Sequence, residues 1–252
     1  YVDGNGTTQF KMNNGNYVLK EGVANNAYTA GSVAGLRPGS IKLKDLDNSG
    51  TIDAKDRQII GRTAPKHTGG FGINGTVYGF DISATFNWVY GNQVYNLDKI
   101  ATTQTYRTTY ANMRDYMSSN NRFTYLDRAT GEIVTDYATL KAMNEGKEYW
   151  SPLSIGDNSP IVTSWAVEDG SFLRLQTLTL GYTFPAKLTG KMGLSKMRIA
   201  LTGTNLGLWT RYSGFDPEAN TGYGTVARLA PGLDMSPYPR PRSFSLSIEL
   251  GF

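Results

Sequence analysis

The sequence contains no cysteine and only one histidine in 252 residues. Without cysteine, the chain can form neither a disulfide framework nor a zinc–thiolate site. It also lacks the Gly-x-Ser-x-Gly motif of serine hydrolases and any histidine-rich metal motif. The single histidine, His67, stands at the start of a predicted strand, where a loop residue is a commoner role than a catalyst. We therefore predict that the chain is not an enzyme.

Long apolar runs and blocks of positive charge are absent as well. No run of about 18 apolar residues occurs, which excludes a transmembrane helix. A membrane β-barrel stays possible, because its strands alternate apolar and polar residues. The formal net charge is +4, and without a cluster of Lys and Arg this charge predicts no nucleic-acid partner.

The last ten residues alternate strictly between apolar and small polar side chains. Successive side chains on a strand point to opposite faces, so this segment is a ribbon with one apolar face. Its length suits a tilted strand that crosses a bilayer. A chain end on an exposed aromatic residue favours a barrel strand over a soluble sandwich, since termini of soluble domains usually fray. The apolar positions, which we take as a barrel-terminal signal, are Phe244, Leu246, Ile248, Leu250 and Phe252.

Further strands with the same alternation are predicted earlier in the chain. Residues 71–77 and 80–90 form a hairpin with a tight turn at Tyr78-Gly79, and its second strand ends in Trp88 and Tyr90. In residues 171–185 the apolar phase slips between Leu175 and Leu178, which indicates either a β-bulge or a portion outside the membrane. A similar slip occurs near Gly203 in the strand that follows.

The connections between these strands alternate between short and long, as in an up-and-down membrane barrel. We predict an all-β chain with a loop region at 1–66 on the extracellular side and barrel strands in 67–252. Long loops are expected at 92–168, with a short helix capped by Asp136, and at 216–242. About five strands cannot close a barrel, so the chain is expected to be part of a larger antiparallel one.

The segment 45–56 has the spacing of a calcium-binding loop. Oxygen-bearing side chains fall at its first, third, fifth, ninth and twelfth positions, with Gly50 at the sixth for the sharp turn and Ile52 packing inward. Calcium requires roughly six to eight oxygen ligands. The twelfth residue is Asp instead of the usual Glu, and no helix is predicted before the loop, so a single structural Ca²⁺ is expected; the alternative is a solvated loop rich in Asx turns. The predicted ligands are Asp45, Asp47, Ser49, the Thr51 carbonyl, Asp53 and Asp56.

Several motifs, taken together and in order, give the chain a resemblance to the C-terminal part of the SusC/RagA family of TonB-dependent outer-membrane transporters. The motifs are Pro38–Lys42, the 45–56 loop, Ile60-Gly61, Pro65-Lys66, Tyr78–Asp81, Tyr90–Asn92, Glu168–Leu175, Leu180–Tyr182 and the terminal Phe252. The resemblance covers most of residues 38–252.

This resemblance implies a transmembrane barrel of about 22 strands in the outer membrane, with a plug and a TonB-binding segment that would precede these residues. It also implies import of oligosaccharides or peptides, driven through the TonB complex, and a SusD-like surface lipoprotein as partner. Long loops would then contact substrate. The candidates for stacking on it are Tyr149, Trp150 and Trp165, although packing inside the loop is the commoner role of such residues.

A secreted, calcium-stabilised β-sandwich that acts as an adhesin or carbohydrate-binding module is the alternative. It would share the alternation and the calcium loop, and its aromatic side chains could stack on sugars. A sandwich, however, needs short loops and a turn signal about every 8–12 residues. The long strands and very long loops of this chain favour the barrel.

Overall fold

The computed structural model describes residues 5–7, 9–13, 16–25, 37–103, 112–152, 162–218 and 231–252. The chain divides into two compact units, one of residues 1–59 and 99–162 and one of residues 60–98 and 163–252. Among the described residues, no helix is both long and apolar enough to cross a membrane.

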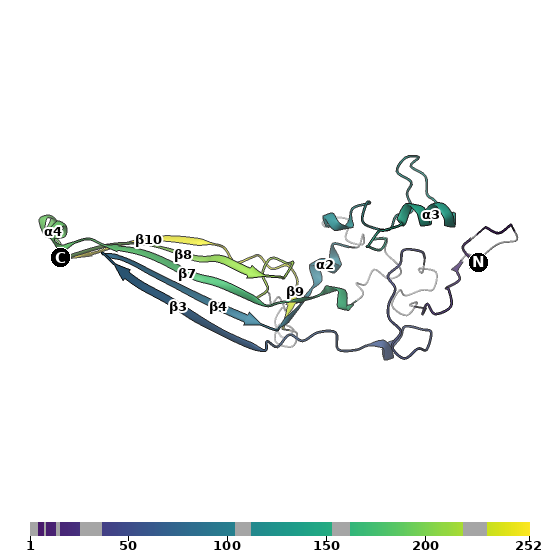
Figure 1. Ribbon diagram of the computed structural model, residues 1–252, viewed down its shortest axis with the longest axis horizontal. Helices are drawn as coiled ribbons and strands as arrows, with labels where there is room; N and C mark the ends of the chain where they lie inside the picture. The colour runs from purple at the N-terminus through teal and green to yellow at the C-terminus, as the bar shows by residue number, and fades with distance from the viewer. Residues whose placement is uncertain are drawn as a thin grey trace. The chain divides into compact units, whose positions relative to one another are not determined.

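The second unit is built on a five-stranded antiparallel sheet with the order β10-β8-β7-β4-β3. Figure 1 shows these strands lying side by side. All five predicted strands are confirmed. Their bounds are β3 His67–Val77, β4 Phe80–Tyr90, β7 Phe172–Thr183, β8 Lys196–Thr210 and β10 Ser243–Gly251.

The two short connections lie at one end of this sheet. Tyr78 and Gly79 both have positive φ, 48° and 86°, as a two-residue hairpin turn that matches the strand twist requires. Between β7 and β8 the chain forms the helix α4 (Ala186–Thr189) and the 3-10 helix η5 (Gly190–Met192). The C-terminus lies beside α4 at this end (Figure 1).

A small three-stranded sheet of order β6-β5-β9 belongs to the same unit. Its strands are β5 Gln93–Asn96, β6 Val167–Asp169 and β9 Leu233–Asp234, and the 3-10 helix η4 (Ser164–Ala166) leads into β6. Val94 and Ala166 are buried here. Because the long connections meet at this end of the large sheet, their residues form a local core that the strands alone would not have.

The other unit consists mainly of loops with short elements. They are β1 Met12–Asn13, β2 Asn16–Tyr17, η2 Ala54–Asp56, η3 Asp115–Met117 and α3 Tyr137–Asn144, while α2 (Leu97–Ala101) lies where the chain passes between units. The predicted cap of α3 is confirmed, because the Asp136 carboxylate accepts a hydrogen bond of 2.9 Å from the Thr139 N–H. Residues 41–44 alternate between apolar and Lys side chains, which predicts a short strand, but this prediction is wrong because they adopt no regular structure. Among the described residues, no strand lies beside these four to pair with them.

The sequence division into an extracellular 1–66 and a membrane 67–252 concerns the sides of a membrane and stays a prediction. What the structure adds is that residues 99–162, the middle of the predicted long loop 92–168, cluster with the N-terminal residues. Parts of the loops 92–168 and 216–242 lie outside the described residues.

Candidate functional site

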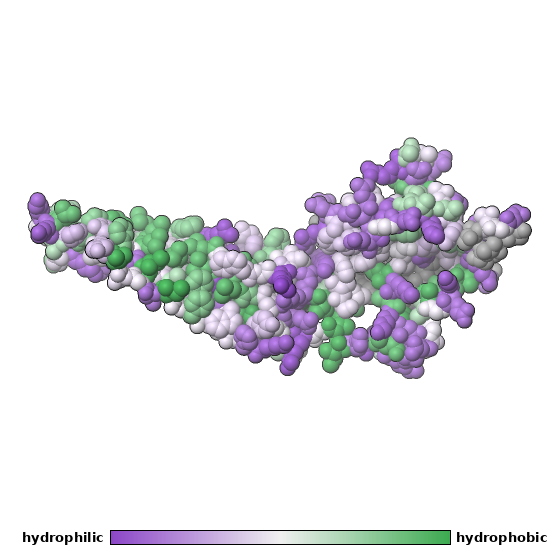
Figure 2. All heavy atoms as spheres, in the orientation of Figure 1, coloured by the Kyte–Doolittle hydropathy of each residue, from purple (hydrophilic) through white to green (hydrophobic). Residues whose placement is uncertain are grey.

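The register of the large sheet places its apolar side chains on one face. One row across all five strands consists of Gly75, Ile82, Leu180, Leu201 and Leu246, and the next of Val77, Phe80, Tyr182, Ile199 and Ile248. These side chains are largely exposed, for example 66% for Leu246 and 58% for Ile248. Figure 2 shows the hydrophobic residues gathered along the strands. An exposed apolar surface of this extent marks an interaction site or a lipid contact.

A β-bulge keeps this face continuous where the sequence alternation slips. The pairing of β4 with β7 shifts at Thr85/Phe86, and the pairing of β7 with β8 shifts between Leu175 and Thr177. In the pairing with β4 the extra residue is Gln176 on β7, so Leu175 and Leu178 remain on the same face. In the pairing with β8, two residues of β8 (205 and 206) lie opposite Gln176. Of the two predicted explanations of the slip, the structure confirms the bulge.

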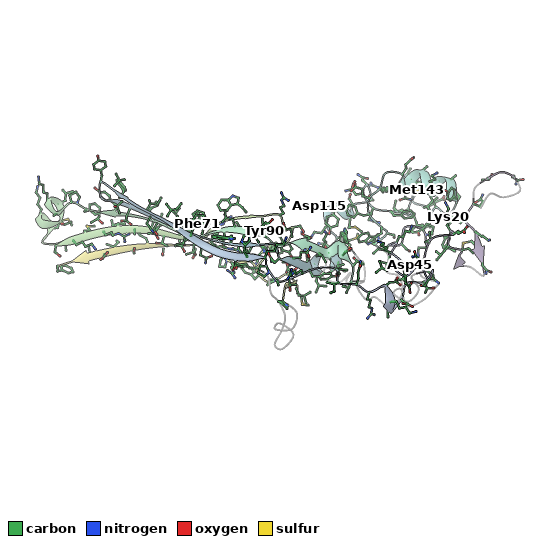
Figure 3. The ribbon with its side chains drawn as sticks, turned by 60° about the horizontal axis from the view of Figure 1, so that its bottom comes forward. Lys20, Asp45, Phe71, Tyr90, Asp115 and Met143 are labelled. Atoms are coloured by element: carbon green, nitrogen blue, oxygen red, sulfur yellow. The ribbon has the colours of Figure 1, made fainter. Side chains whose placement is uncertain are left out.

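Aromatic residues border the apolar face at both ends. At the short-turn end, the rings of Phe80 and Tyr182 lie 4.5 Å apart. At the other end, Trp209 and Tyr90 are 55% and 52% exposed, and Figure 3 shows Tyr90 towards the opposite end of the sheet from α4, with Phe71 between. Aromatic belts at both edges of an apolar band are typical of membrane-spanning strands.

The opposite face of the sheet carries small and polar side chains. One row runs through Ser83, Thr179, Thr202 and Ser245, and the hydroxyl oxygens of Thr179 and Thr202 lie 3.0 Å apart. This is the composition expected for strands that line a hydrated barrel interior.

An ion pair crosses this polar face over a glycine. Arg198 on β8 donates two hydrogen bonds to the Asp81 carboxylate on β4, at 3.0 and 2.5 Å. The strand between them contributes Gly181, where an added Cβ would lie 2.4 Å from Asp81 Oδ1 and 2.5 Å from Arg198 Nη2. Glycine is therefore required at this position for the pair to form across β7.

A buried arginine joins the sheet to the segment after β8. The Arg174 side chain is 1% exposed, and its Nη2 lies 2.7 Å from Asp216 and 3.0 Å from Glu218. Its Nη1 donates to Asn205, which sits at the β8 irregularity with φ 55°. Arg240 also pairs with Glu218, at 3.0 Å. Because buried charges are tolerated only when they are paired, this network fixes the segment to the polar face.

A second polar cluster lies nearby in the same unit. The Glu168 carboxylate accepts hydrogen bonds from the Ser213 N–H and hydroxyl, at 2.9 and 2.8 Å. The buried Tyr212 donates its hydroxyl proton to Asp234, and burial first, then this carboxylate, raises the pKa of Tyr212 above its usual range. Glu168 precedes a strand, where a solvated loop end is the ordinary expectation, but here its carboxylate makes a tertiary contact.

The structure brings together three of the predicted calcium ligands. Carboxylate oxygens of Asp45, Asp47 and Asp56 lie within 4.8 Å of one another. Gly50, at φ 81°, turns the loop, and its N–H donates to Asp45 at 2.7 Å. Hydrogen bonding to Ser49, first through its side chain, lowers the pKa of Asp47. This carboxyl is therefore ionised at neutral pH.

The remaining predicted ligands take other positions around this cluster. The Asp53 carboxylate caps the short helix η2 and accepts a bond of 2.6 Å from the Lys55 N–H. The Ser49 hydroxyl donates to the Thr51 carbonyl oxygen at 2.9 Å, so these two groups are hydrogen-bonded to each other within the loop. Ile52 is buried, as the pattern predicts. The three clustered carboxylates are ligands of the kind that a hard cation such as Ca²⁺ takes, and Figure 3 marks the loop at Asp45.

The three predicted aromatic contacts fall in different units. Tyr149 and Trp150 neighbour each other, with ring centroids 6.3 Å apart, and Tyr149 also packs against Tyr116 at 5.1 Å. Trp165 belongs to η4 in the other unit. All three are half-buried, and their contact with a substrate stays a prediction.

The sequence did not indicate the roles of Arg174, Asp216 and Gly181. Arg174 stands at a polar position of β7, where any residue of a hydrated face could stand. Its partner Asp216 lies 42 positions away in the sequence. A large charged residue among small ones on that face was the available signal.

No family model matches the chain. Its sequence is 30% identical to TonB-dependent receptor P3 of Formosa agariphila over 85% of this chain and 19% of that receptor. It is 24% identical to TonB-dependent receptor SusC of Bacteroides thetaiotaomicron over 82% of the chain and 17% of SusC. The chain thus spans about a fifth of the length of the curated relatives that it matches.

Solved structures with a similar fold include the RagAB peptide transporter, with a TM-score of 0.55, 24% identity and coverage of 75% of this chain and 17% of that one. The RagAB peptide importer in its "closed-closed" state gives a TM-score of 0.57, also at 24% identity, over 85% of this chain and 20% of that one. These relatives are receptors and transporters, in agreement with the prediction that the chain is not an enzyme. The chain is therefore a relative of the SusC/RagA family of TonB-dependent receptors, and its antiparallel sheet has the fold of a segment of their barrels.

Proposed function

We propose that the chain forms part of an outer-membrane β-barrel importer that takes up oligosaccharides or peptides with energy supplied through TonB. The observation that carries this proposal is the continuous, exposed apolar face across five strands, with a small polar face behind it. Lipid is the surrounding that makes such an exposed face stable, and a hydrated interior suits the polar face.

The dimensions of the strands support this placement. β4 has 11 residues, which at about 3.4 Å each reach about 37 Å and, tilted by roughly 35–45°, cover about 26–30 Å of bilayer thickness. The turn at Tyr78-Gly79 and the α4 connection then lie on the periplasmic side, because barrels carry their short turns there. The small sheet and the long connections lie on the extracellular side.

The partners follow from the relatives. A SusD-like lipoprotein would cover the extracellular loops, and TonB would engage a segment of the protein outside this sequence. The RagAB structures are of a peptide importer, and the resemblance to the SusC/RagA family also implies import of oligosaccharides. Uptake of both substrate classes is therefore tested.

The 45–56 loop would hold one Ca²⁺ as a structural ion in an extracellular loop. The cluster of Asp45, Asp47 and Asp56 supports this proposal, since three carboxylates so close repel one another and a bound cation relieves that repulsion. The ion would stiffen the loop and take no part in transport chemistry.

The β-sandwich alternative requires a second sheet over the apolar face. Within the described ranges the other sheets have two and three strands, and the apolar side chains of β10 remain 46–67% exposed. The same side chains would be buried in a sandwich core, so the alternative has no structural support.

The experiment is a deletion of the gene in the source bacterium, followed by uptake of labelled oligosaccharides and labelled peptides. Uptake of one class should fall to background, return with the intact gene, and disappear when the proton gradient is collapsed. A tagged copy should copurify with a surface lipoprotein from the outer membrane. Unchanged uptake of both classes, or recovery of the protein from the soluble fraction, would contradict the proposal.

A further inference from the structure

A hollow of about 590 Å³ opens at the end of the large sheet opposite the short turns. Trp88, Tyr90 and Trp209 contribute to its wall. Trp88 and Trp209 pair in register with the same residue, Leu173, from the strands on either side of β7. Both therefore stand on the apolar face, about 10 Å apart at their backbones.

The aromatic wall is held in place by the first residue of β3. The Trp88 indole N–H donates to His67 Nδ1 at 3.0 Å, and the His67 ring stacks on Tyr90 with centroids 4.9 Å apart. Gly69 leaves room for the Trp88 ring, since an added Cβ would lie 2.3 Å from it. These contacts hold Trp88 and Tyr90 in fixed positions, while Trp209 remains 55% exposed.

Polar groups of Asp169, Ser171 and Arg211 also line the hollow. Asp169 Oδ1 accepts from the Ser171 N–H at 2.9 Å, and hydrogen bonding from Ser171, first through its side chain and then through its N–H, lowers the pKa of Asp169. The Ser171 hydroxyl oxygen also accepts from the Gly91 N–H at 2.9 Å. The Arg211 guanidinium is exposed and makes no ion pair within the described part of the chain.

This combination selects the ligand chemistry. Exposed aromatic rings stack on the C–H faces of a sugar, a carboxylate and a hydroxyl bind sugar hydroxyls, and an arginine binds phosphate with paired N–H donors. A bare anion would be repelled by Asp169, and a purely apolar ligand would offer the Arg211 guanidinium no acceptor.

We propose that the hollow binds the sugar-phosphate headgroup of a glycolipid in the outer leaflet. The inference rests on the proposed function, which puts the apolar face in lipid and this end of the sheet outside. The acyl chains would continue down the apolar face from Trp88 and Trp209, so the hollow is continuous with the lipid contact. The transported substrate would pass on the opposite, polar face, and this site is therefore separate from the transport path.

The test compares variants of the full-length protein for lipid retained after purification from outer membranes, measured by native mass spectrometry. Trp209→Leu keeps the face apolar but removes the indole, and Arg211→Gln removes the cation. Matched controls are Phe80→Leu, an exposed aromatic residue on the same face at the short-turn end, and Lys191→Gln, an exposed cation at that same end of the sheet. Purified lipopolysaccharide, phosphatidylglycerol vesicles and soluble glucosamine 1-phosphate serve as probes.

Each test variant should retain about fivefold less lipopolysaccharide than the wild type, the loss expected for one stacking contact or one charged hydrogen bond, while the controls retain it unchanged. Equal retention by all proteins would overturn the proposal. So would an equal loss of phosphatidylglycerol, or binding of the soluble sugar phosphate as tight as that of the glycolipid. If the wild type is absent from the outer membrane, the proposed function fails; if the variants insert and take up substrate but retain lipid normally, only this inference fails.

Discussion

At the scale of single residues, the polar face depends on its small side chains as much as on its charged ones. The Asp81–Arg198 pair spans from β4 to β8 because Gly181 on the intervening strand has no side chain. The sequence marked Leu180-Gly181-Tyr182 only as part of a family motif. The physical reason for its glycine is the close approach of the two charged groups.

Gly181→Ala should destabilise the protein, because its methyl group would displace the Asp81 carboxylate or the Arg198 guanidinium. Either displacement weakens the ion pair and lowers the free energy of unfolding. Gly72→Ala is the matched control, since its Cβ would meet the Ala84 carbonyl oxygen at 3.6 Å, an ordinary contact. Samples of each full-length variant are heated to a series of temperatures, and the loss of the folded band on a gel gives the midpoint temperature of unfolding. Equal midpoints for the two variants would contradict this explanation.

Arg174→Met should be more damaging than any exposed charge deletion. It leaves the carboxylates of Asp216 and Glu218 without their buried partner, which typically costs about 3–5 kcal/mol of the free energy of unfolding. Lys196→Met removes one member of an ion pair that is 51% exposed, for which about 0–1 kcal/mol is expected. Urea unfolding of the full-length protein in detergent compares them, and a similar cost for both variants would show that the buried network is not stabilising.

At the scale of elements, the alternation of apolar and polar residues predicted the strands of the sheet and the bulge in β7, because the residues of each apolar face are close neighbours in the sequence. The hairpin turn at Tyr78-Gly79 and the cap at Asp136 were predictable for the same reason. The strand predicted at 41–44 did not form, since a four-residue alternation forms a strand only if a partner strand lies beside it. The contacts of Arg174 and Glu168 join distant segments, and no local pattern encodes them.

The 45–56 loop should bind Ca²⁺ through its clustered carboxylates. Asp45→Asn and Asp56→Asn should each weaken binding about tenfold or more, as expected for loss of a charged ligand. Asp53→Asn, which lies outside the cluster and caps η2, should change affinity less. Calorimetric titration of the full-length protein with CaCl₂ measures all three, and absence of a binding signal in the wild type would favour the solvated-loop alternative.

The same titration at lower pH provides a second check. Asp47 is held ionised by hydrogen bonding to Ser49, which lowers its pKa. Calcium binding should therefore be constant above the ordinary pKa of aspartate and weaken as the pH falls below about 4. Binding that declined already between about pH 8 and 6 would point to a histidine and not to this cluster.

At the scale of the whole molecule, the proposal that the apolar face contacts lipid rests on the alternation in the sequence together with the register of the paired strands. The sequence indicated which residues of each strand share a face, but only the pairing of β10, β8, β7, β4 and β3 shows that the five apolar faces coincide. A bulge in the middle of β7 preserves this agreement. Substrate and partners cannot be obtained in this way, because the chain spans about a fifth of its relatives.

The most direct measurement of the central claim is a cysteine scan of residues 244–250 in the full-length protein with any native cysteines replaced. Each position carries a spin label, and accessibility to oxygen in lipid and to a water-soluble nickel chelate is recorded in vesicles. Phe244, Leu246, Ile248 and Leu250 should report lipid, and Ser245, Ser247 and Glu249 should report water, in strict alternation. Accessibility without a period of two residues, or lipid contact on the serine face, would contradict the account.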